Sequence, residues 1–339
     1  MAKRYGFIAI IIVILIGSVV LVGYQEVPAI VIIASMIATT IAVATPLTLG
    51  ALSGVFCERS GVVNIGIEGM MLAGAFFGWL ASIYMNSIFG FSATPSILAG
   101  VLAALLAGGL FALLHAALSI TFKVDQIIGG TVINILALGL TGYFYTANLT
   151  TMGKFDPIDI PVLSSLPLVG PVLFSNPPIT YAAIILVILV HYLMYHTRWG
   201  LRTRAVGEHP RAADTVGIHV FRMRYANVII GGMIAGLAGA FLPLEAVGSF
   251  ERAMTNGRGF IALAVMIFGN WTPLGALGGA LLFGLASALQ TQLQFLGLAD
   301  LIPHQFVGML PYLLTIIVLT GFVGRVRAPA ADGKVYEKE

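Results

Sequence analysis

The chain has 339 residues, of which 59% are hydrophobic and 9% are charged, with a formal net charge of +3. Soluble domains carry roughly 25% charged residues, so this composition excludes a soluble protein and predicts a polytopic, all-α membrane protein. The small net charge argues against a nucleic-acid partner, and the single cysteine, Cys57, excludes a disulfide within the chain.

Apolar stretches of membrane-spanning length recur along the whole chain, which predicts one transmembrane domain over residues 1–339. The first stretch follows Lys3 and Arg4, is longer than a signal-peptide core and has no small-residue cleavage site after it, so we expect a retained helix. About ten transmembrane or broken helices are expected, of which only the eighth is too short to cross alone. Their approximate ranges are 6–24, 27–49, 64–88, 95–121, 125–148, 179–197, 225–248, 259–270, 273–295 and 303–323.

The positive charges predict an orientation. With the N-terminus inside, all of the 17 Lys and Arg residues fall on the inner side except Lys154, Arg252 and Arg258. Because cytoplasmic loops accumulate Lys and Arg, we expect both termini in the cytoplasm. The proline-rich segment 149–178 is then an ordered or extended outer loop, either a connector or a contact for a partner.

The stretch "CERSGVVNIGIEGMML", residues 57–72, places polar side chains and glycines inside an apolar region. Exposed backbone is tolerated at membrane depth only inside the protein or beside a water-filled cavity, so a broken helix in the interior is expected. Asn64 and Glu68 share a helix face if the next helix begins near Val62. Glu68 either lines a solute path, or it caps a neighbouring half-helix or pairs with Arg59.

Few charged groups lie at membrane depth, which favours a neutral solute over ion coupling. Polar side chains that could bind such a solute are Asn64, Gln126, Thr131 and Asn134, while Phe76, Phe77 and Trp79 could line its route. Glu245, near the outer end of the seventh span, is a further candidate for the path. For the aromatic residues, ordinary lipid or helix contacts are the alternative.

The basic loop 198–224 contains a candidate short helix. Pro210 suits the first turn of a helix and Gly217 suits its end, with Ala212, Ala213 and Val216 on one side. A helix of fewer than about two turns is not stable alone, so packing must hold it. We therefore expect a docking element rather than a simple topology anchor.

A second interruption is expected over residues 251–279, with a short helix after Gly259 and a turn at Asn270–Pro273. Two glycine-interrupted segments in the two halves of a transporter indicate a central path. Small-xxx-small pairs, which allow close helix packing, occur at Gly50/Gly54, Gly74/Gly78 and Gly275/Gly279.

Three separated stretches together resemble a known family. They are "ALSGVFCERSGVVNIGIEGMMLAGAFFG", "GLRTRAVGEHPRAADTVGI" and "GFIALAVMIFGNWTPLGALGGALLFG". They are similar to the permease subunits of ABC importers in the branched-chain amino acid, ribose and nucleoside group, and most of all to nucleoside-type permeases that work with a basic membrane lipoprotein. The resemblance covers about residues 35–325.

The resemblance implies a permease that pairs with a second, similar permease or with itself around a shared path. It also implies two cytoplasmic ATPase subunits, an extracytoplasmic solute-binding lipoprotein and a place in the plasma (inner) membrane of a prokaryote. The docking motif of such importers reads E-A-A, three residues, G; Ala212, Ala213 and Gly217 match it, whereas Arg211 replaces the glutamate and the later I-x-L-P is absent. The residues expected to couple to the ATPase are Glu208, Pro210, Arg211, Ala212, Ala213, Asp214 and Gly217.

The chain contains no G-x-x-x-x-G-K-[ST] motif, so ATP hydrolysis is expected on a partner and not on this subunit. His191 and His196 have the wrong spacing for one helix face, and no metal site, cofactor or catalytic constellation is expected. The first hypothesis is an ABC permease that moves a nucleoside by alternating access. Simple sugars or branched-chain amino acids are the rival cargoes, and a secondary carrier or channel that works alone is the alternative from another class.

Overall fold

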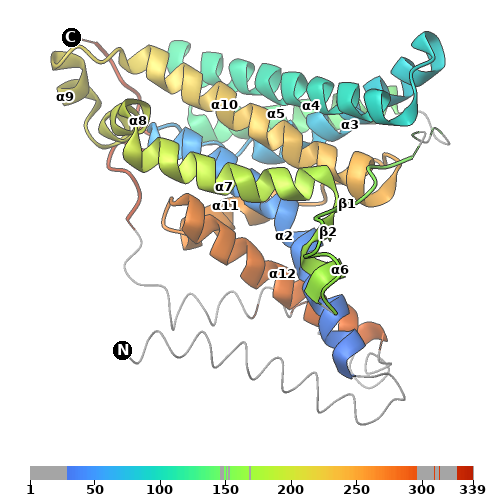
Figure 1. The fold of residues 1–339 in the computed structure, drawn as a ribbon. Coiled ribbons are helices and arrows are strands. Elements are labelled where there is room, and N and C mark those ends of the chain that lie inside the picture. Colours follow the sequence, from blue (N-terminus) through green and yellow to red (C-terminus); the bar gives the residue numbers. More distant parts are fainter. Residues whose placement is uncertain are drawn as a thin grey trace, which may run out of the picture. The chain divides into compact units, whose positions relative to one another are not determined.

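The computed structural model describes residues 29–145, 149, 151, 153–167, 169–295, 309, 313 and 327–338. Helices dominate this part of the chain and its only strands form one short pair, which confirms the expected all-α class (Figure 1). The expected span 6–24 lies outside the described residues, as does 303–323 apart from residues 309 and 313.

The elements follow the chain without long gaps up to residue 295. They are α2 (Ala29–Arg59), α3 (Ile67–Phe89), α4 (Ala93–Ala116), the π-helix η1 (Ala117–Thr121), α5 (Gln126–Phe144), β1 (Ile158–Asp159), α6 (Val169–Leu173), β2 (Ser175–Asn176), α7 (Pro178–His196), α8 (Arg198–Glu208), α9 (Pro210–Thr215), α10 (Val220–Phe241), the π-helix η2 (Leu242–Val247), α11 (Arg258–Phe268) and α12 (Pro273–Phe295).

Seven helices in the described part of the chain are long and apolar enough to cross a membrane. They cover Ile30–Arg59, Ile67–Phe89, Ala93–Thr121, Gln126–Phe144, Pro178–His196, Val220–Val247 and Pro273–Phe295. The eighth expected span falls on α11, which is shorter, as its sequence indicated. The total number of crossings stays a prediction.

The chain divides into two compact units. Unit 1 comprises Met1–Ala44, Pro157–Pro177 and Gly279–Val326, and unit 2 comprises Thr45–Asp156, Pro178–Gly278 and Arg327–Glu339. Pro46 lies where α2 passes from one unit to the other, and its ring removes a backbone donor from the helix there.

Unit 1 contains the first part of α2, the last part of α12 and a short hairpin. Met36 of α2 packs with Ala288 of α12, and Ser35 Oγ donates a hydrogen bond to Gln292 Oε1 over 3.2 Å. Strands β1 and β2 are antiparallel and are separated by the short helix α6. The segment expected as a proline-rich loop is therefore ordered over this hairpin.

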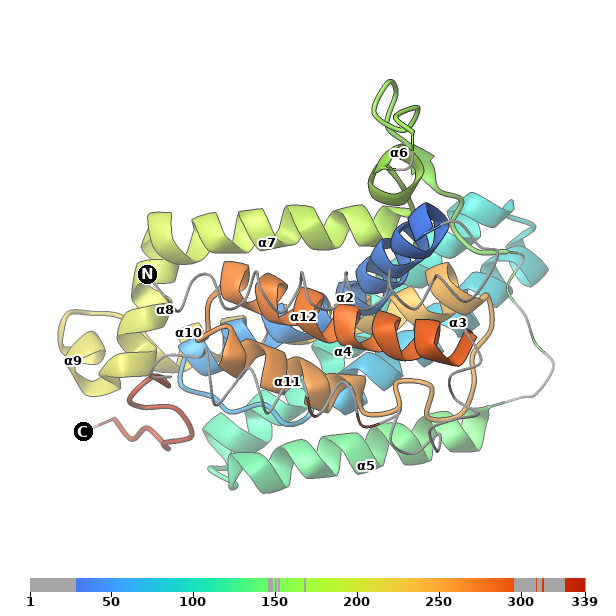
Figure 2. The same cartoon turned by 90° about the horizontal axis from the view of Figure 1, so that it is seen from below.

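Unit 2 is built around α3, α4 and α10, which pack against one another, while α5 packs on α3. In Figures 1 and 2 these helices and α7 run along the unit with nearly parallel axes. A Cβ added at Gly74 would lie 2.4 Å from the Gly236 carbonyl oxygen, and one at Gly78 would lie 3.1 Å from that of Gly100. This small-xxx-small pair therefore brings α3 into close contact with α10 and α4.

The contact between α10 and α4 allows a test of this packing. A Cβ at Gly236 would lie 2.1 Å from the Ala104 carbonyl oxygen, whereas a Cβ at Gly139 of α5 has nothing within 4 Å. We expect Gly236→Ala to lower the free energy of unfolding by about 1–3 kcal/mol, because the helices must separate. Gly139→Ala is expected to be neutral or slightly stabilising. Thermal unfolding in detergent compares the two, and equal midpoints would contradict the packing argument.

Candidate functional site

The helix break expected between residues 57 and 72 is present, since α2 ends at Arg59 and α3 begins at Ile67. Gly61 has a φ of +85°, a left-handed conformation that glycine adopts without strain. The turn is closed by Ser60 Oγ and Val62 N, which both donate to the Cys57 carbonyl oxygen over 2.7 and 3.1 Å. The chain therefore crosses from α2 to α3 through an interior segment without helical hydrogen bonds.

Side chains from α4 and α5 pair with the backbone of this segment. Gln126 Oε1 accepts a hydrogen bond from Val63 N at 2.7 Å, and the Val63 carbonyl oxygen lies 3.0 Å from His115 Nε2. Asn134 binds twice: its Nδ2 donates to the Ile65 carbonyl oxygen at 3.1 Å and its Oδ1 accepts from Gly69 N at 2.7 Å. These groups replace the missing helical partners, which a break at membrane depth requires.

The polar residues predicted along a solute path have different positions around the break. Asn64, Gln126 and Asn134 are brought together there, and the Oδ1 atom of buried Asn64 has no partner among the described residues. Thr131 is exposed on α5, and its hydroxyl donates to the Ile127 carbonyl oxygen. Contact of these side chains with solute stays a prediction.

Glu68 caps the short helix α11. Its two carboxylate oxygens accept hydrogen bonds from Gly257 N at 2.8 Å and Gly259 N at 2.6 Å, at the point where α11 begins. The first N–H groups of a helix have no helical partners and carry partial positive charge, so a carboxylate stabilises them. The half-helix cap considered from the sequence is therefore formed, and Arg59 does not pair with this carboxylate.

Glu245 has the same kind of role at a different helix. Its carboxylate accepts from Ile179 N at 2.7 Å, from Thr180 N at 3.1 Å and from Thr180 Oγ1 at 2.6 Å, all in the first turn of α7. This pairing could not be predicted from local sequence, because Glu245 and the start of α7 lie about 65 positions apart in the chain. Both glutamates expected along the path thus bind a helix N-terminus.

Glu58 and Arg59 join the first helix break to the turn between α11 and α12. Arg59 Nε donates to the Trp271 carbonyl oxygen at 2.8 Å, and its Nη2 donates to that of Asn270 at 3.1 Å. Trp271 Nε1 in turn donates to Glu58 Oε2. Asn270 and Trp271 have φ values of 52° and 53°, so this turn is held in a left-handed conformation by long-range contacts.

Phe76 lies in an aromatic cluster of unit 2. Its ring centroid lies 5.2 Å from that of Phe250, and Trp79 and Tyr145 complete the cluster. Ring contacts of this kind are ordinary helix packing, and the predicted place of Phe76, Phe77 and Trp79 along the route of the solute stays a prediction.

The basic loop contains the expected short helix and one that was not expected. α9 begins at Pro210, and Gly217 beyond its end has a φ of +85°. Residues Arg198–Glu208 also form a helix, α8, with Thr197 Oγ1 as its N-cap acceptor from Gly200 N at 3.3 Å. The Thr-x-x-Gly start was the signal for α8, but four charged side chains in eleven residues resembled a loop.

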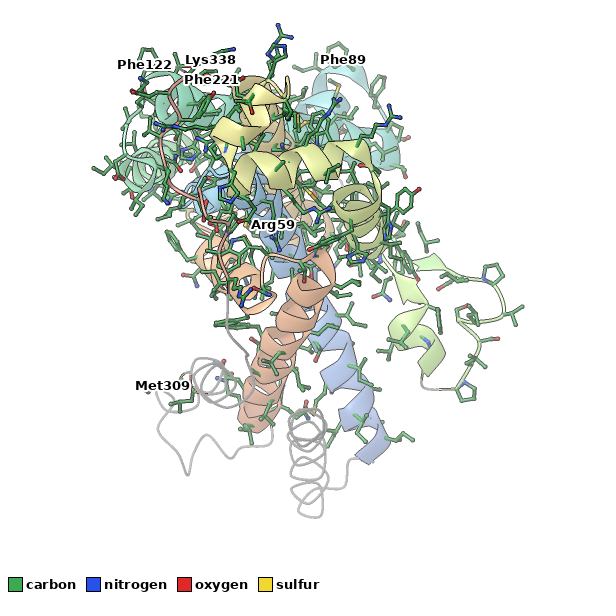
Figure 3. The ribbon with its side chains drawn as sticks, turned by 90° about the vertical axis from the view of Figure 1, so that its left-hand side faces the viewer. Arg59, Phe89, Phe122, Phe221, Met309 and Lys338 are labelled. Carbon is green, nitrogen blue, oxygen red and sulfur yellow. The ribbon has the colours of Figure 1, made fainter. Side chains whose placement is uncertain are left out.

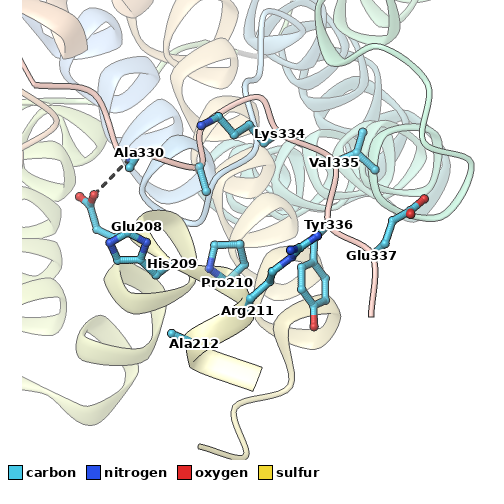
Figure 4. A pocket seen from close by; sticks show the side chains of 11 residues that line it. Glu208, His209, Pro210, Arg211, Ala212, Ala330, Lys334, Val335, Tyr336 and Glu337 are labelled. Carbon is cyan, nitrogen blue, oxygen red and sulfur yellow. Dashed lines mark hydrogen bonds between the residues drawn. The ribbon is translucent and has the colours of Figure 1, made fainter. Parts of the chain in front are cut away.

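One side of α9 is packed and the other is exposed to solvent. Ala213, only 3% exposed, lies in a cluster with Val206, Val220 and Met223, whereas Val216 is 76% exposed. Arg211 and Ala212 are also exposed, and with the C-terminal residues they line a groove of about 660 Å³ (Figure 4). The groove is bridged by Ala330 N, which donates to Glu208 Oε2 at 3.1 Å.

Comparison with known proteins gives consistent results. The sequence profile described as "Branched-chain amino acid transport system / permease component" matches residues 36–319. The chain is 44% identical to the guanosine ABC transporter permease protein NupQ of Bacillus subtilis, over 91% of this chain and 98% of the relative. It is 40% identical to the nucleoside ABC transporter permease protein NupC of Lactococcus lactis, over 89% and 96%, and 36% identical to the putative glucose ABC transporter permease protein TsgC13 of Haloferax volcanii, over 90% and 98%.

Proposed function

The chain belongs to the family of branched-chain amino acid transport system permease components and is a membrane-spanning permease subunit of an ABC transporter, and we propose that its cargo is a nucleoside. The observation that carries this proposal is the 44% identity to a guanosine permease across nearly the full length of both chains. The relative named as a putative glucose permease is less similar, at 36% identity, so a sugar is the principal rival cargo.

The solute path runs beside the break between α2 and α3 and is shared with a second permease. Polar side chains at membrane depth gather at this break, which supports the placement. A nucleoside offers several hydrogen-bonding groups and no net charge, in keeping with amide side chains such as Asn64, Gln126 and Asn134. The remaining residues proposed along the path are Glu68, Phe76, Thr131 and Glu245.

The end of unit 2 that carries α8 and α9 faces the cytoplasm and receives an ATPase. Support comes from the six arginines between Thr197 and Arg224, which fit the inner side of a membrane. The ATPase contacts the exposed side of α9, where Arg211, Ala212 and Val216 are accessible. Binding and hydrolysis of ATP then shift the permease between outward-open and inward-open packings.

A complete transporter contains this chain, a homologous permease or a second copy, two ATPase subunits and an extracytoplasmic solute-binding lipoprotein. Membership of the ABC permease family supports the ATPase partners. The lipoprotein supplies much of the selectivity for the solute, which is why cargo is tested on the whole assembly.

The test is uptake into proteoliposomes that contain the permease, its ATPase and the lipoprotein. We expect ATP-dependent uptake of radiolabelled guanosine that excess unlabelled nucleoside abolishes and that excess glucose or leucine leaves unchanged. If glucose competes and unlabelled nucleoside does not, the cargo is a sugar and not a nucleoside. Uptake by the permease without ATPase, following an ion gradient, would show a secondary carrier instead and overturn the proposal.

A further inference from the structure

The C-terminal residues 327–338 run along the end of unit 2 that carries α8 and α9 (Figures 1 and 2). Ala331 N donates a hydrogen bond to the Gly207 carbonyl oxygen of α8 at 2.9 Å. The neighbouring residue, Ala330, donates its N–H to the Glu208 carboxylate. Arg327 N donates to Asn270 Oδ1, in the turn between α11 and α12, at 3.1 Å. One short segment thus contacts both α8 and the second helix break.

The far part of the segment packs against α9 and α10. The Tyr336 ring is buried in the cluster that also contains Ala213 of α9, and its centroid lies 5.4 Å from that of Phe221. In Figure 3, which looks onto the left-hand side of Figure 1, the labels of Phe221 and Lys338 stand next to each other. Lys338 Nζ lies 3.6 Å from Asp214 Oδ1 of α9. These contacts hold the C-terminal segment against α9 and α10.

In the middle of the segment, Asp332 enters the interior at the first helix break. Its carboxyl group shares a hydrogen bond with that of Glu58, the residue that also binds Trp271. Arg224, only 2% exposed, faces Asp332, and its Nη1 donates to the Lys334 carbonyl oxygen at 2.9 Å. Asp332 therefore contacts both α2, through Glu58, and α10, through Arg224.

The glycine at the break makes room for this arrangement. A Cβ at Gly61 would lie 2.8 Å from Arg224 Nη2 and 3.0 Å from the Ala331 carbonyl oxygen. Any other residue would displace either the guanidinium group or the C-terminal segment, in addition to the strain of its positive φ. The first helix break is thus shaped around the segment.

The polar contacts in this cluster are incomplete. Asp332 Oδ1, Arg224 Nε and Arg224 Nη2 are buried and have no hydrogen-bond partner among the described residues. Unpaired buried polar atoms are costly, so a small shift that joins carboxylate and guanidinium is favourable. The cluster can therefore adopt two arrangements, one with the Asp332 carboxyl group bound to Glu58 and one with it bound to Arg224.

We propose that residues 327–338 form a C-terminal strap that transmits movement of α8 and α9 to both interrupted helices, with Asp332 as its positioning residue. The proposal rests on the proposed function, in which an ATPase moves α9. The strap is the element that contacts α8, α9, Glu58 and Asn270 together. Its role is mechanical, and it binds neither solute nor nucleotide.

The docking of the strap should depend on pH. Burial raises the pKa of Asp332 from 3.8 to about 6, although Arg224 opposes the shift; Glu58, Cys57 and Tyr336 are the other titratable groups that face this cluster. The docked strap binds a proton more tightly than the released one, so docking is favoured below pH 6 and weakens as the pH rises through 6. We expect docking to be about tenfold tighter at pH 5 than at pH 7.5.

Trypsin cleavage after Lys334 measures this equilibrium in the detergent-solubilised protein. The cleavage rate, corrected with a free peptide of the same sequence, should rise between pH 5 and pH 7.5. Asp332→Asn, which keeps a hydrogen bond to Glu58 but cannot titrate, should flatten the profile. An equally steep profile in this variant would contradict the assignment to Asp332.

The decisive experiment measures solute transported per ATP hydrolysed in proteoliposomes that hold the complete transporter. Asp332→Ala should lower this ratio at least fivefold while ATP hydrolysis continues, because α9 moves without the helix breaks. Glu337→Ala removes an exposed carboxylate of the same strap and should stay within twofold of wild type. Asp332→Asn, which keeps a hydrogen bond to Glu58, should retain most of the wild-type ratio of solute transported to ATP hydrolysed.

A deletion of residues 327–339 gives a second reading if Asp332→Ala does not fold. It too should lower the ratio at least fivefold. A wild-type ratio of solute transported to ATP hydrolysed in either variant would overturn the proposal that the strap transmits movement. All ratios are measured with whichever solute the wild-type transporter moves, so the strap is tested independently of the cargo. If the wild-type transporter carries glucose and not guanosine, the proposed cargo is wrong and the test of the strap still holds.

Discussion

Replacing Val216 by glutamate is expected to abolish ATP-driven uptake while the permease stays folded and inserted. Val216 directly follows α9 and is 76% exposed, so the substitution leaves the packing of Ala213 intact. An apolar side chain at the proposed ATPase contact would be covered in the complex, and an unpaired charge buried there costs about 3–5 kcal/mol. Affinity for the ATPase should fall at least a hundredfold, measured by co-purification and by guanosine uptake in proteoliposomes.

Val162→Glu is the matched control for this substitution. Val162 is 80% exposed and lies in the 157–177 segment of unit 1, so the same chemical change is made at equal exposure elsewhere in the chain. We expect ATPase binding to stay at the wild-type level. Retention of the ATPase and of uptake by Val216→Glu would exclude the exposed end of α9 as the contact.

The helical fold and its breaks could be predicted from local signals. Hydropathy located the long apolar helices between residues 29 and 295, and Pro210 and Gly217 marked the two ends of α9 because each acts through its own backbone. α8 was missed because it is stabilised by tertiary packing: its buried Gly200, Thr203 and Val206 alternate with arginines that suggested a loop.

The partners of the polar residues could not be predicted. Contact of Gln126 and Asn134 with a solute stays a prediction, whereas their hydrogen bonds to the backbone around the break had no signal in the sequence. Glu58 and Arg59 stand next to each other in the sequence, but both reach Trp271 more than 200 positions away. A sequence shows which side chains need a polar partner, and only the packing of distant helices shows which partner they find.

Loss of the Glu68 carboxylate is expected to be the most damaging single change at the helix breaks. Glu68→Ala removes the acceptor of both Gly257 N and Gly259 N at the start of α11. Hydrogen bonds to charged groups contribute about 1.5–3 kcal/mol each, so the variant should lose several kcal/mol of stability and at least nine-tenths of its uptake. Gly259→Ala should have a similar effect, because its Cβ would lie 2.8 Å from Glu68 Oε2.

Glutamine at position 68 separates a structural role from contact with the solute, and Glu245→Gln makes the same change at the second capping glutamate proposed along the path. Glutamine keeps one acceptor oxygen in each cap, and both glutamates accept two or more hydrogen bonds from the first turn of a neighbouring helix. Because both oxygens of Glu68 are already engaged, we expect the two variants to lower the thermal midpoint by similar amounts. The KM for guanosine should then stay within twofold of wild type. A tenfold rise in KM for either variant, at an unchanged midpoint, would place that carboxylate on the solute instead.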